Sequence, residues 1–333
     1  MSVFQAMRPS DIYETMLITR EKCGTEFFLN ESDGFAGVDC PACSAPSSQA
    51  AFAFYKYGFR HLTCPACSTL YVTPRPTHAQ LSTYYTGYDA PRMWTEILLR
   101  TSDTRKVVQH MPRVRKLQGL LEAHAAPRDC FVDLGAGNGI FAKAVAQAAL
   151  FGRTIACDIS PRCTEACQAL GLETVTGTLE SFAPSSLDCV SSNDLIEHLH
   201  DPAGLLLQLR SRLRDGGLIQ IATPNGEGFD FKLLGDKTDN ITPPEHLQYF
   251  NPRSISLLLE RCGFEPIDVT TPGVLDMEIV KRHRNERGFD LGRANAFLEH
   301  LYALGDKDME ASFQTFLADN KLSSHMLVYA RKV

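Results

Sequence analysis

Two cysteine pairs of identical spacing are the clearest chemical feature of the sequence. Cys40-Pro-Ala-Cys43 and Cys64-Pro-Ala-Cys67 repeat one tetrapeptide, with twenty residues between the two copies. Such knuckles direct four thiolates at a single tetrahedral zinc ion. Because every ligand position is a thiolate, none remains for water, and we predict a structural ion rather than a catalytic one. A disulfide pair or a redox dithiol is the alternative, which the repeated motif and an expected reducing compartment disfavour.

A glycine-rich segment is the second feature that could support chemistry. It reads DLGAGNG, starting at Asp133, with glycines at Gly135, Gly137 and Gly139. Glycines in a strand-to-helix turn let a ligand approach the backbone, and the start of the helix supplies amide donors. A dinucleotide-binding loop would have a glycine at position 140, where this chain has Ile140. The spacing therefore predicts a nucleotide-type ligand but departs from the dinucleotide pattern.

An acidic residue stands where such a ligand would place its ribose. Asp158 lies nineteen residues beyond Gly139 and directly follows the apolar run 154–157. A carboxylate at the end of a second strand can accept hydrogen bonds from both ribose hydroxyls. The alternative is a turn residue beside a helix cap at Ser160. Its register with the glycine loop favours the binding role.

The segments around these residues alternate between short apolar runs and helical stretches. Pro161 and Pro202 each follow a capping residue, as at the first turn of a helix. Such alternation predicts an α/β fold with a doubly wound, mostly parallel sheet. The expected strands are 130–133, 154–157, 172–175, 187–192, 218–222, 266–270 and 324–331.

Three regions are expected along the chain. Residues 1–90 form an N-terminal segment that contains a zinc-ribbon module at 36–75, whose strands flank the stretch AFAFYKYGFRHL. Residues 91–127 form a helical connector. Residues 128–333 form a Rossmann-like domain with a helical insertion at 276–322. Residues 1–35 have no clear periodicity and give no firm prediction.

Composition and charge argue against several classes of function. The chain has 333 residues, 44% hydrophobic, and a formal net charge of −6, which argues against broad nucleic-acid binding. The N-terminus lacks the pattern of a secretory signal, and no apolar stretch is long enough to span a bilayer, so a cytoplasmic protein without membrane insertion is expected. Of the eleven cysteines, the seven outside the paired motif are interpreted as small hydrophobes, not redox groups.

The order of several motifs resembles a known family. VDLGAGNG, CDIS, SSNDLIEHLHDP and LRDGGLIQIATPN follow one another as in class I S-adenosylmethionine-dependent methyltransferases. The resemblance covers about residues 128–275, with 326–331 as an antiparallel seventh strand. With the zinc module, the TPRP segment at 73–76 and the tyrosines that follow, it is similar to bacterial enzymes that methylate sugars, including nucleotide sugars.

The resemblance implies a site for S-adenosylmethionine at the ends of the first four strands. Its expected residues are Asp133, Gly135, Ala136, Gly137 and Gly139 for the methionine end, Asp158 and Ile159 for ribose and adenine, Thr178 and Leu179 for the adenine edge, and Asn193, Asp194 and Leu195 near the sulfonium. The family often has aspartate where this chain has Thr178. A contact with the adenine amino group must then come from its hydroxyl or from backbone.

A protein base helps methyl transfer only when the acceptor is a hydroxyl, because the cofactor carbon is already activated. In related sugar and small-molecule methyltransferases the loop after the fifth strand faces the acceptor, and here it reads DNITPPEHLQYF. We predict His246 as the base, with Glu245 or Tyr249 as an orienting group; simple packing of the loop is the alternative. For Glu197 and His198 the favoured role is structural, as cap and anchor of the helix beginning near residue 201.

The acceptor is the least constrained part of the prediction. The resemblance favours a sugar, nucleotide sugar or glycoconjugate precursor. A phenolic or quinone-like acceptor is the second enzyme hypothesis, and a zinc-ribbon scaffold with a non-catalytic methyltransferase fold is the third. Tyr84, Tyr85 and Tyr88 face either the ligands or the core. No nucleic-acid partner is expected, and the sequence does not indicate an oligomeric state.

Overall fold

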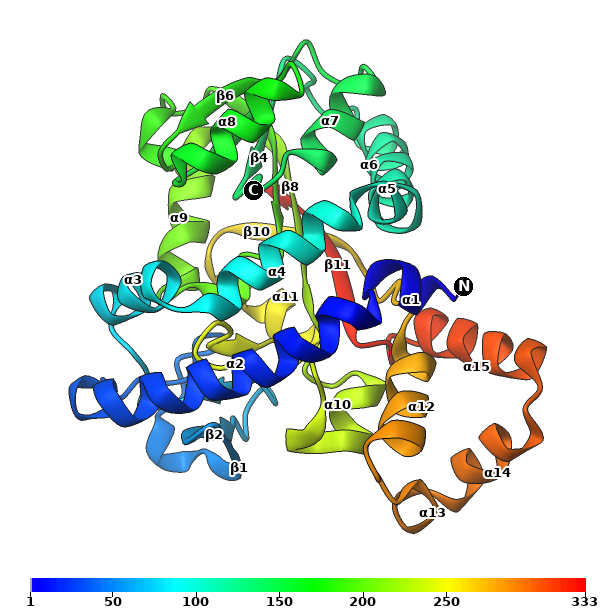
Figure 1. Ribbon diagram of the computed structural model, residues 1–333. Helices are drawn as coiled ribbons and strands as arrows, with labels where there is room; N and C mark the ends of the chain where they lie inside the picture. Colours follow the sequence, from blue (N-terminus) through cyan, green and yellow to red (C-terminus); the bar gives the residue numbers. More distant parts are fainter. Residues whose placement is uncertain (1) are drawn as a thin grey trace.

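A central sheet of seven strands organises the protein, for which a computed structural model describes residues 2–333 (Figure 1). The strand order is β10-β11-β8-β7-β4-β5-β6, and only β11 runs antiparallel to its neighbours. This confirms the predicted Rossmann-like architecture. The strands are β4 Cys130–Leu134, β5 Arg153–Asp158, β6 Glu173–Thr176, β7 Leu187–Asn193, β8 Leu213–Pro224, β10 Phe264–Thr270 and β11 His325–Lys332.

Helices cover both faces of this sheet, because successive strand residues point to opposite sides. Val132 belongs to the apolar cluster that includes residues of α9 and α11, whereas its neighbour Phe131 belongs to the cluster that includes residues of α6 and α7. Both faces are therefore buried, which accounts for the near-continuous apolar runs of the strands. The helices concerned are α6 Met111–Ala123, α7 Ile140–Gln147, α8 Pro161–Ala169, α9 Pro202–Arg212 and α11 Pro252–Arg261.

A second, four-stranded sheet carries the cysteine knuckles. Its order is β1-β2-β3-β9, with β1 Ala51–Lys56, β2 Phe59–Thr63, β3 Leu70–Val72 and β9 Gln248–Tyr249. The fourth strand comes from the loop after β8, with Leu70 opposite Tyr249 and Tyr71 opposite Gln248. The N-terminal module is thus completed by a strand that lies almost 180 residues further along the sequence than β3. The loop predicted to face the acceptor is fixed to the cysteine module by this pairing.

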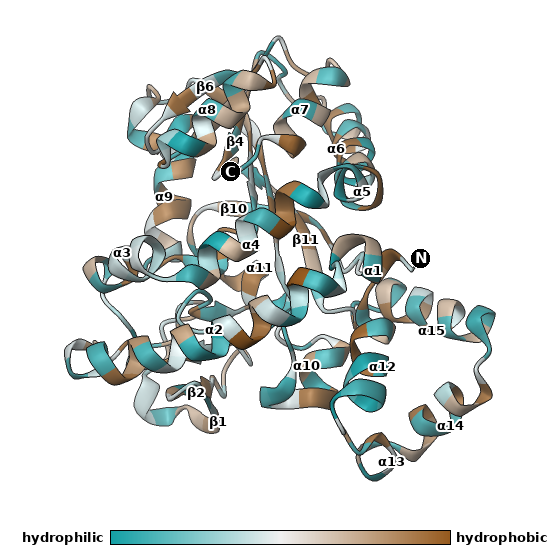
Figure 2. Cartoon of the chain, viewed as in Figure 1, coloured by the Kyte–Doolittle hydropathy of each residue, from teal (hydrophilic) through white to brown (hydrophobic). Residues whose placement is uncertain are grey.

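Helices of the N-terminal half lie across the molecule in Figure 1, with α2 and α4 side by side. They are α1 Val3–Met7, α2 Ser10–Glu31, α3 His78–Gly87, α4 Asp89–Arg100 and α5 Ser102–Arg105, and a π-helical turn at Lys106–His110 leads into α6. Helix α2 was not predicted. Its buried face repeats at helical spacing but includes Arg20 and Gly24, so hydropathy alone does not mark it. Figure 2 shows hydrophilic and hydrophobic residues mixed along its length.

A helical segment separates β10 from β11. It comprises α12 Asp276–Glu286, α13 Leu291–Ala294, α14 Ala296–Leu304 and α15 Lys307–Asp319, while α10 Phe229–Leu234 follows β8. These helices share an apolar cluster with α2 residues such as Tyr13 and Met16. Across residues 2–333, no helix combines the length and apolarity needed to cross a membrane.

Candidate active site

The glycine loop directly follows β4 and is held against the neighbouring strand. The backbone N–H groups of Gly135 and Ala136 both donate to the carbonyl of Cys157, at 2.8 and 3.1 Å. Gly137 has φ +53°, and a Cβ added there would meet no atom within 4 Å. At Gly139, with φ +73°, a Cβ would lie 2.8 Å from the Cys167 sulfur. The absence of a side chain at Gly139 therefore allows Cys167 to pack closely against the loop, whereas Gly137 borders open space.

Asp158 ends β5 and connects this strand to the glycine loop. One carboxylate oxygen accepts the N–H of Gly137 at 3.0 Å, and the other accepts the N–H of Ser160 at 2.9 Å. Each oxygen keeps a lone pair for a further donor. The next residue, Ile159, is 76% exposed although it is apolar. The carboxylate can accept hydrogen bonds from ribose hydroxyls, and the uncovered apolar side chain beside it can pack on the flat face of the base.

Asp133 lies beneath the loop, not on its open side. Its side chain is buried and accepts a hydrogen bond from the Ser191 hydroxyl at 2.6 Å. Burial raises the pKa of Asp133 to about 6, against the opposing effect of the hydrogen bonds from Ser191 and Asn193. The acid therefore ties β4 to β7 under the loop.

The residues expected at the adenine edge divide into two environments. Thr178 is exposed, and its hydroxyl oxygen accepts the N–H of Glu180 at 3.3 Å. Leu179 is buried in the core, so any contact that it makes with a ligand must come from its backbone.

The end of β7 contributes three residues close to the glycine loop. Asn193 accepts hydrogen bonds from Arg113 at 2.9 Å and Gln220 at 3.1 Å, which fix its amide. Asp194 has φ +51°, and its N–H donates to the carbonyl of Ala222. Leu195 packs over the loop, because a Cβ at position 135 would lie 3.2 Å from its side chain.

The residues predicted for the cofactor thus lie in the last residues of β4, β5 and β7 or in the loops that follow β4, β5, β6 and β7. These four strands are adjacent in the sheet, in the order β7-β4-β5-β6. The chain proceeds from β4 to one side through β5 and β6 and then returns to β7 on the other. Ligands of open α/β sheets bind at the carboxyl edge beside such a reversal.

His246 lies between β8 and β9, beside His198, for which the sequence predicts a structural role. The rings of His198 and His246 are 4.6 Å apart between centroids and nearly perpendicular. The Nδ1 atom of His246 is buried and has no hydrogen-bond partner among the described residues. Burial, together with the nearby His198, holds the pKa of His246 well below its usual range. Its imidazole is therefore neutral near pH 7.

Glu245 does not orient His246 as expected. Its carboxylate is buried and forms two hydrogen bonds with the Arg20 guanidinium of α2, at 3.1 and 3.2 Å, and one with the Tyr84 hydroxyl at 3.3 Å. Tyr249 does not contact His246 through its hydroxyl either, since that oxygen accepts the N–H of Thr242. Glu245 is an ion-pair partner that fixes the loop to α2.

Glu197 also differs from its expected role as a helix cap. The cap of α9 is Asp201, whose carboxylate accepts the N–H of Gly204 at 2.9 Å. Glu197 is fully buried; one oxygen accepts the Thr223 hydroxyl at 2.9 Å, and Oε1 has no partner. Burial raises the pKa of Glu197 well above its usual range. Neighbouring His198 faces the site, not the helix.

Helix α3 adds one tyrosine to this side of the site. The Tyr85 hydroxyl lies 2.9 Å from Nδ1 of His198, and the same nitrogen lies 2.8 Å from the Glu245 carbonyl oxygen. Tyr84 is fully buried and stacks on Tyr88, with 5.2 Å between ring centroids. Of the three tyrosines singled out in the sequence, one therefore reaches the histidine pair and the other two pack in the core.

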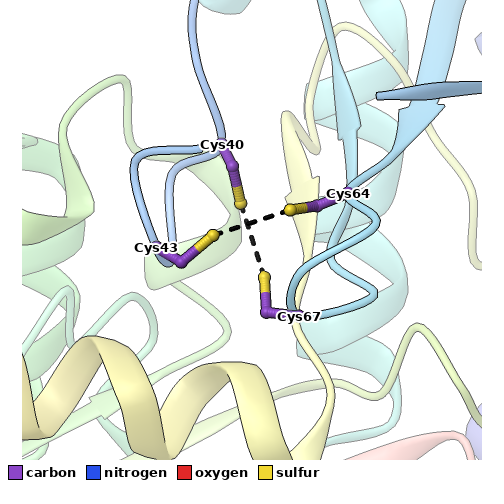
Figure 3. A group of neighbouring side chains, drawn as sticks. All are labelled: Cys40, Cys43, Cys64 and Cys67. Atoms are coloured by element: carbon purple, nitrogen blue, oxygen red, sulfur yellow. Dashed lines mark hydrogen bonds between the residues drawn. The ribbon is translucent and has the colours of Figure 1, made fainter. Parts of the chain in front are cut away.

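The four cysteines of the paired motif converge, as Figure 3 shows. Their sulfurs lie within 4.8 Å of one another, with 3.5 Å between Cys40 and Cys67 and between Cys43 and Cys64. A tetrahedral zinc–thiolate site has sulfurs about 3.8 Å apart, given Zn–S bonds of about 2.3 Å. None of the eleven cysteines in the described chain forms a disulfide. The donor set and its geometry fit zinc.

The two knuckles also share one backbone conformation. After each pair comes a serine with φ +60°, and the N–H of Ser44 and Ser68 donates to the carbonyl of the first cysteine of its own pair, at 2.9 Å. Asn251, the cap of α11, donates to the Cys67 carbonyl. The cluster is therefore built into the interface with the central sheet.

Comparison with known proteins identifies the class. The sequence profile of a family described as a methyltransferase domain matches residues 86–269, more than half of the chain. The chain belongs to this family of methyltransferase domains.

Individual relatives cover smaller parts of the chain. It is 31% identical over 103 residues to a ubiquinone biosynthesis O-methyltransferase of Parvibaculum lavamentivorans, covering 28% of this chain and 40% of that protein. A protein of the same name from Xanthomonas campestris pv. campestris is 27% identical over 118 residues, covering 33% of this chain and 48% of the relative. The matches thus span less than half the length of these curated relatives.

Two solved structures of methyltransferases resemble the chain in fold. Geranyl diphosphate methyltransferase in complex with S-adenosylmethionine is 17% identical, with a TM-score of 0.45 over 74% of this chain and 91% of that one. A methyltransferase dependent on the same cofactor, from Archaeoglobus fulgidus, is 17% identical, with a TM-score of 0.42 over 66% and 94% of the respective chains.

Proposed function

We propose that the protein transfers the methyl group of S-adenosylmethionine to a hydroxyl oxygen of a small molecule. The observation that carries the proposal is the position of two sets of groups along one sheet edge. The Gly137–Asp158 contact marks a nucleoside position at the ends of β4 and β5. The pair His198 and His246, whose pKa values are both lowered by burial, lies beyond the end of β7, where the chain continues past Asn193.

In this arrangement the cofactor ribose binds Asp158 and its adenine covers Ile159. The methionine end lies over Gly137, where the open space would accept it. The sulfonium then faces the residues after β7, and the acceptor enters from the side of His198 and His246. Buried surroundings exclude water and hold the acceptor oxygen in line with the methyl group, which is how such enzymes gain most of their rate.

The proton of the acceptor hydroxyl leaves through the histidine pair. A neutral imidazole can accept a proton or polarise a hydroxyl near pH 7. His246 has a free Nδ1, whereas Nδ1 of His198 is engaged by the Glu245 carbonyl. The catalytic contribution expected of Glu245 is indirect, because its carboxylate fixes the loop through Arg20.

A hydroxyl of a phenol or hydroquinone is the acceptor class we favour. The curated relatives carry names that specify O-methyl transfer in ubiquinone biosynthesis. The sugar acceptor expected from the sequence gains no such support. Sugar hydroxyls are therefore included in the test below as the competing class of acceptor.

The test is methyl transfer from labelled S-adenosylmethionine to two acceptor panels, substituted hydroquinones and catechols in one and nucleotide sugars in the other. We expect transfer to the first panel, with turnover reduced at least about a hundredfold in His246→Ala and cofactor affinity retained. Glu165→Gln, an exposed substitution on α8, is the matched control. Transfer confined to the sugar panel would overturn the acceptor class, and unchanged turnover in His246→Ala would overturn the role of the pair.

We also propose that the four cysteines bind a structural zinc ion. Buried thiolates at this spacing leave no position for water, so the ion would order the knuckles rather than act on the acceptor. Metal analysis should find one zinc per chain at this cluster, lost in Cys43→Ser together with thermal stability. Cys163→Ser, which alters a cysteine outside the cluster, should keep both. Zinc retention in Cys43→Ser would contradict the assignment.

A further inference from the structure

We propose that Glu197, His198 and His246 bind a divalent cation, and that this cation holds the oxygen of the acceptor during methyl transfer. The inference rests on the proposed O-methyl transfer and changes one step of it: the histidines hold the cation, and the ion acidifies the bound hydroxyl in place of direct proton transfer to His246. One ligand atom from each of the three residues lies within 4.8 Å of the other two. The cluster is separate from the four-cysteine site and lies beside the expected methyl position.

Unused donor atoms in a buried place are the first argument. Glu197 is fully buried, yet its Oε1 has no hydrogen-bond partner. Nδ1 of His246 is also buried and without a partner. A buried polar atom without a partner is unfavourable by roughly 1–3 kcal/mol. Two such atoms, on residues whose ligand atoms lie within 4.8 Å of one another, are explained by a ligand that accepts electron pairs from both.

The orientation of His198 is the second argument. Its Nδ1 lies 2.8 Å from the Glu245 carbonyl oxygen, so Nδ1 carries the proton and donates. The proton on Nδ1 leaves Nε2 with its lone pair free. Metal-binding histidines are usually oriented in this way, by a hydrogen bond from the other ring nitrogen to a carbonyl or a carboxylate. The Glu245 carboxylate, held by Arg20, keeps that segment of backbone in place.

The donor set indicates the kind of ion. Two imidazoles and one carboxylate suit zinc, iron(II), cobalt(II) or manganese(II) better than magnesium or calcium, which prefer oxygen ligands. Donor atoms bound at about 2.1 Å in a tetrahedral arrangement lie about 3.4 Å apart. Each pair in the cluster would therefore close by no more than about 1.4 Å when the ion binds, which imidazole rotation can supply.

Three protein ligands leave open coordination positions, as in catalytic sites and unlike the four-cysteine cluster. An acceptor oxygen that binds there is acidified by the ion. The hydroxyl releases its proton to water, and the oxygen lone pair forms the bond to the methyl carbon. The carbon–sulfur bond breaks, and its electron pair returns to sulfur. Two open positions would favour acceptors with adjacent oxygens, such as catechols.

The test measures metal binding directly, without any acceptor. Cobalt(II) is titrated into the zinc-loaded full-length protein, and binding is followed by calorimetry and by visible absorption. We expect one site with weak bands typical of nitrogen and oxygen ligands and no intense thiolate-to-cobalt band. Glu197→Gln, His198→Gln and His246→Gln should each weaken this binding at least about tenfold.

His200→Gln is the matched control, because this histidine is only two residues from His198 and contacts His78 instead. It should bind cobalt as the wild type does, and thermal melts should show that every variant is folded. If wild-type protein binds no cobalt at millimolar concentration, or if the three variants bind it unchanged, the metal site is overturned.

Activity separates this proposal from the previous one. Methyl transfer that continues at full rate in a chelator that leaves the cysteine-bound zinc in place would overturn the metal site but leave O-methyl transfer intact. Cobalt binding that depends on the three residues, without methyl transfer to any tested hydroxyl, would support the site and overturn the proposed acceptor.

Discussion

The backbone N–H of Gly137 donates to the carboxylate of Asp158 at 3.0 Å, which joins the glycine loop to the end of the adjacent strand. The same carboxylate accepts the N–H of Ser160 at the start of α8. The acid therefore organises the site before any ligand binds. Its remaining lone pairs are free for a second role, which is to accept hydrogen bonds from a ligand.

Removal of the Asp158 carboxylate should weaken cofactor binding. Asp158→Ala deletes the acceptor for the Gly137 amide and the proposed acceptor for both ribose hydroxyls. Charge-assisted hydrogen bonds of this kind contribute about 1.5–3 kcal/mol each, so affinity should fall at least about tenfold. Calorimetric titration with S-adenosylhomocysteine measures this, with Glu165→Gln as a control that should bind normally. Equal affinity in Asp158→Ala would place the ribose elsewhere.

Substitutions at two glycines of the loop should have different effects. Gly137→Ala introduces a side chain into open space, so the folded protein should lose only about 1–2 kcal/mol from the positive φ while cofactor affinity falls sharply. Gly139→Ala brings a Cβ to 2.8 Å from the Cys167 sulfur and should lower stability more. Thermal melts and ligand titrations of both variants measure the contrast. Normal binding by Gly137→Ala would mean that the open space is not the ligand position.

Substitutions of Arg20 and Glu245, which form a buried ion pair, should have strongly non-additive effects on the free energy of unfolding. Both side chains are nearly inaccessible, at 7% and 5% exposure, so removing one partner leaves the other charge unpaired. Arg20→Met or Glu245→Leu alone should lower the free energy of unfolding by about 3–5 kcal/mol, whereas the double variant should recover most of the loss. Urea unfolding of the four proteins measures the coupling. Additive losses would show that the pair does not fix the loop.

Stability should fall as the pH rises through the titration of Asp133. Its pKa is about 6 in the folded protein, raised from the ordinary value of 3.8. A raised carboxyl pKa means that the folded state binds the proton more tightly, so the contribution is present below pH 4 and is lost as the pH passes 6. From pH 5 to 7.5 the loss should be about 1 kcal/mol.

Asp133→Asn is the reference for this effect, because the amide keeps an acceptor for the Ser191 hydroxyl but does not titrate. The free energy of unfolding of the wild type relative to this variant, from urea titrations, should decrease between pH 5 and 7.5. A difference that stays constant, or grows with pH, would contradict the raised pKa.

The central sheet was predictable because its evidence is local. Apolar runs of four to seven residues, caps followed by proline, and glycine turns each specify one element, and parallel strands bring their carboxyl ends to one edge. The residues predicted for the cofactor, from Asp133 to Leu195, could therefore be placed at one edge of the sheet from the sequence, and their role in binding stays a prediction. The cysteine cluster was equally accessible, since its spacing is part of the chemistry.

The acceptor side depends on contacts that local patterns do not specify. Arg20 is 225 residues from Glu245 in the sequence, and its charge hides the buried face of α2. Strand β9 has only two residues and pairs with a distant strand. The burial of Glu197 was missed because a glutamate near a helix start is usually exposed, whereas this one is fully buried. The two EH pairs, Glu197-His198 and Glu245-His246, were visible, but nothing local indicates that they meet.

The most direct test of the account is a crystal structure of the protein with S-adenosylhomocysteine. We predict ribose hydroxyls on the Asp158 carboxylate, adenine over Ile159, the homocysteine carboxylate end above Gly137, and a sulfur that faces His246 from the end of β7. Ligand bound with its sulfur directed away from His198 and His246, or at another edge of the sheet, would contradict the assignment of the methyl-transfer centre.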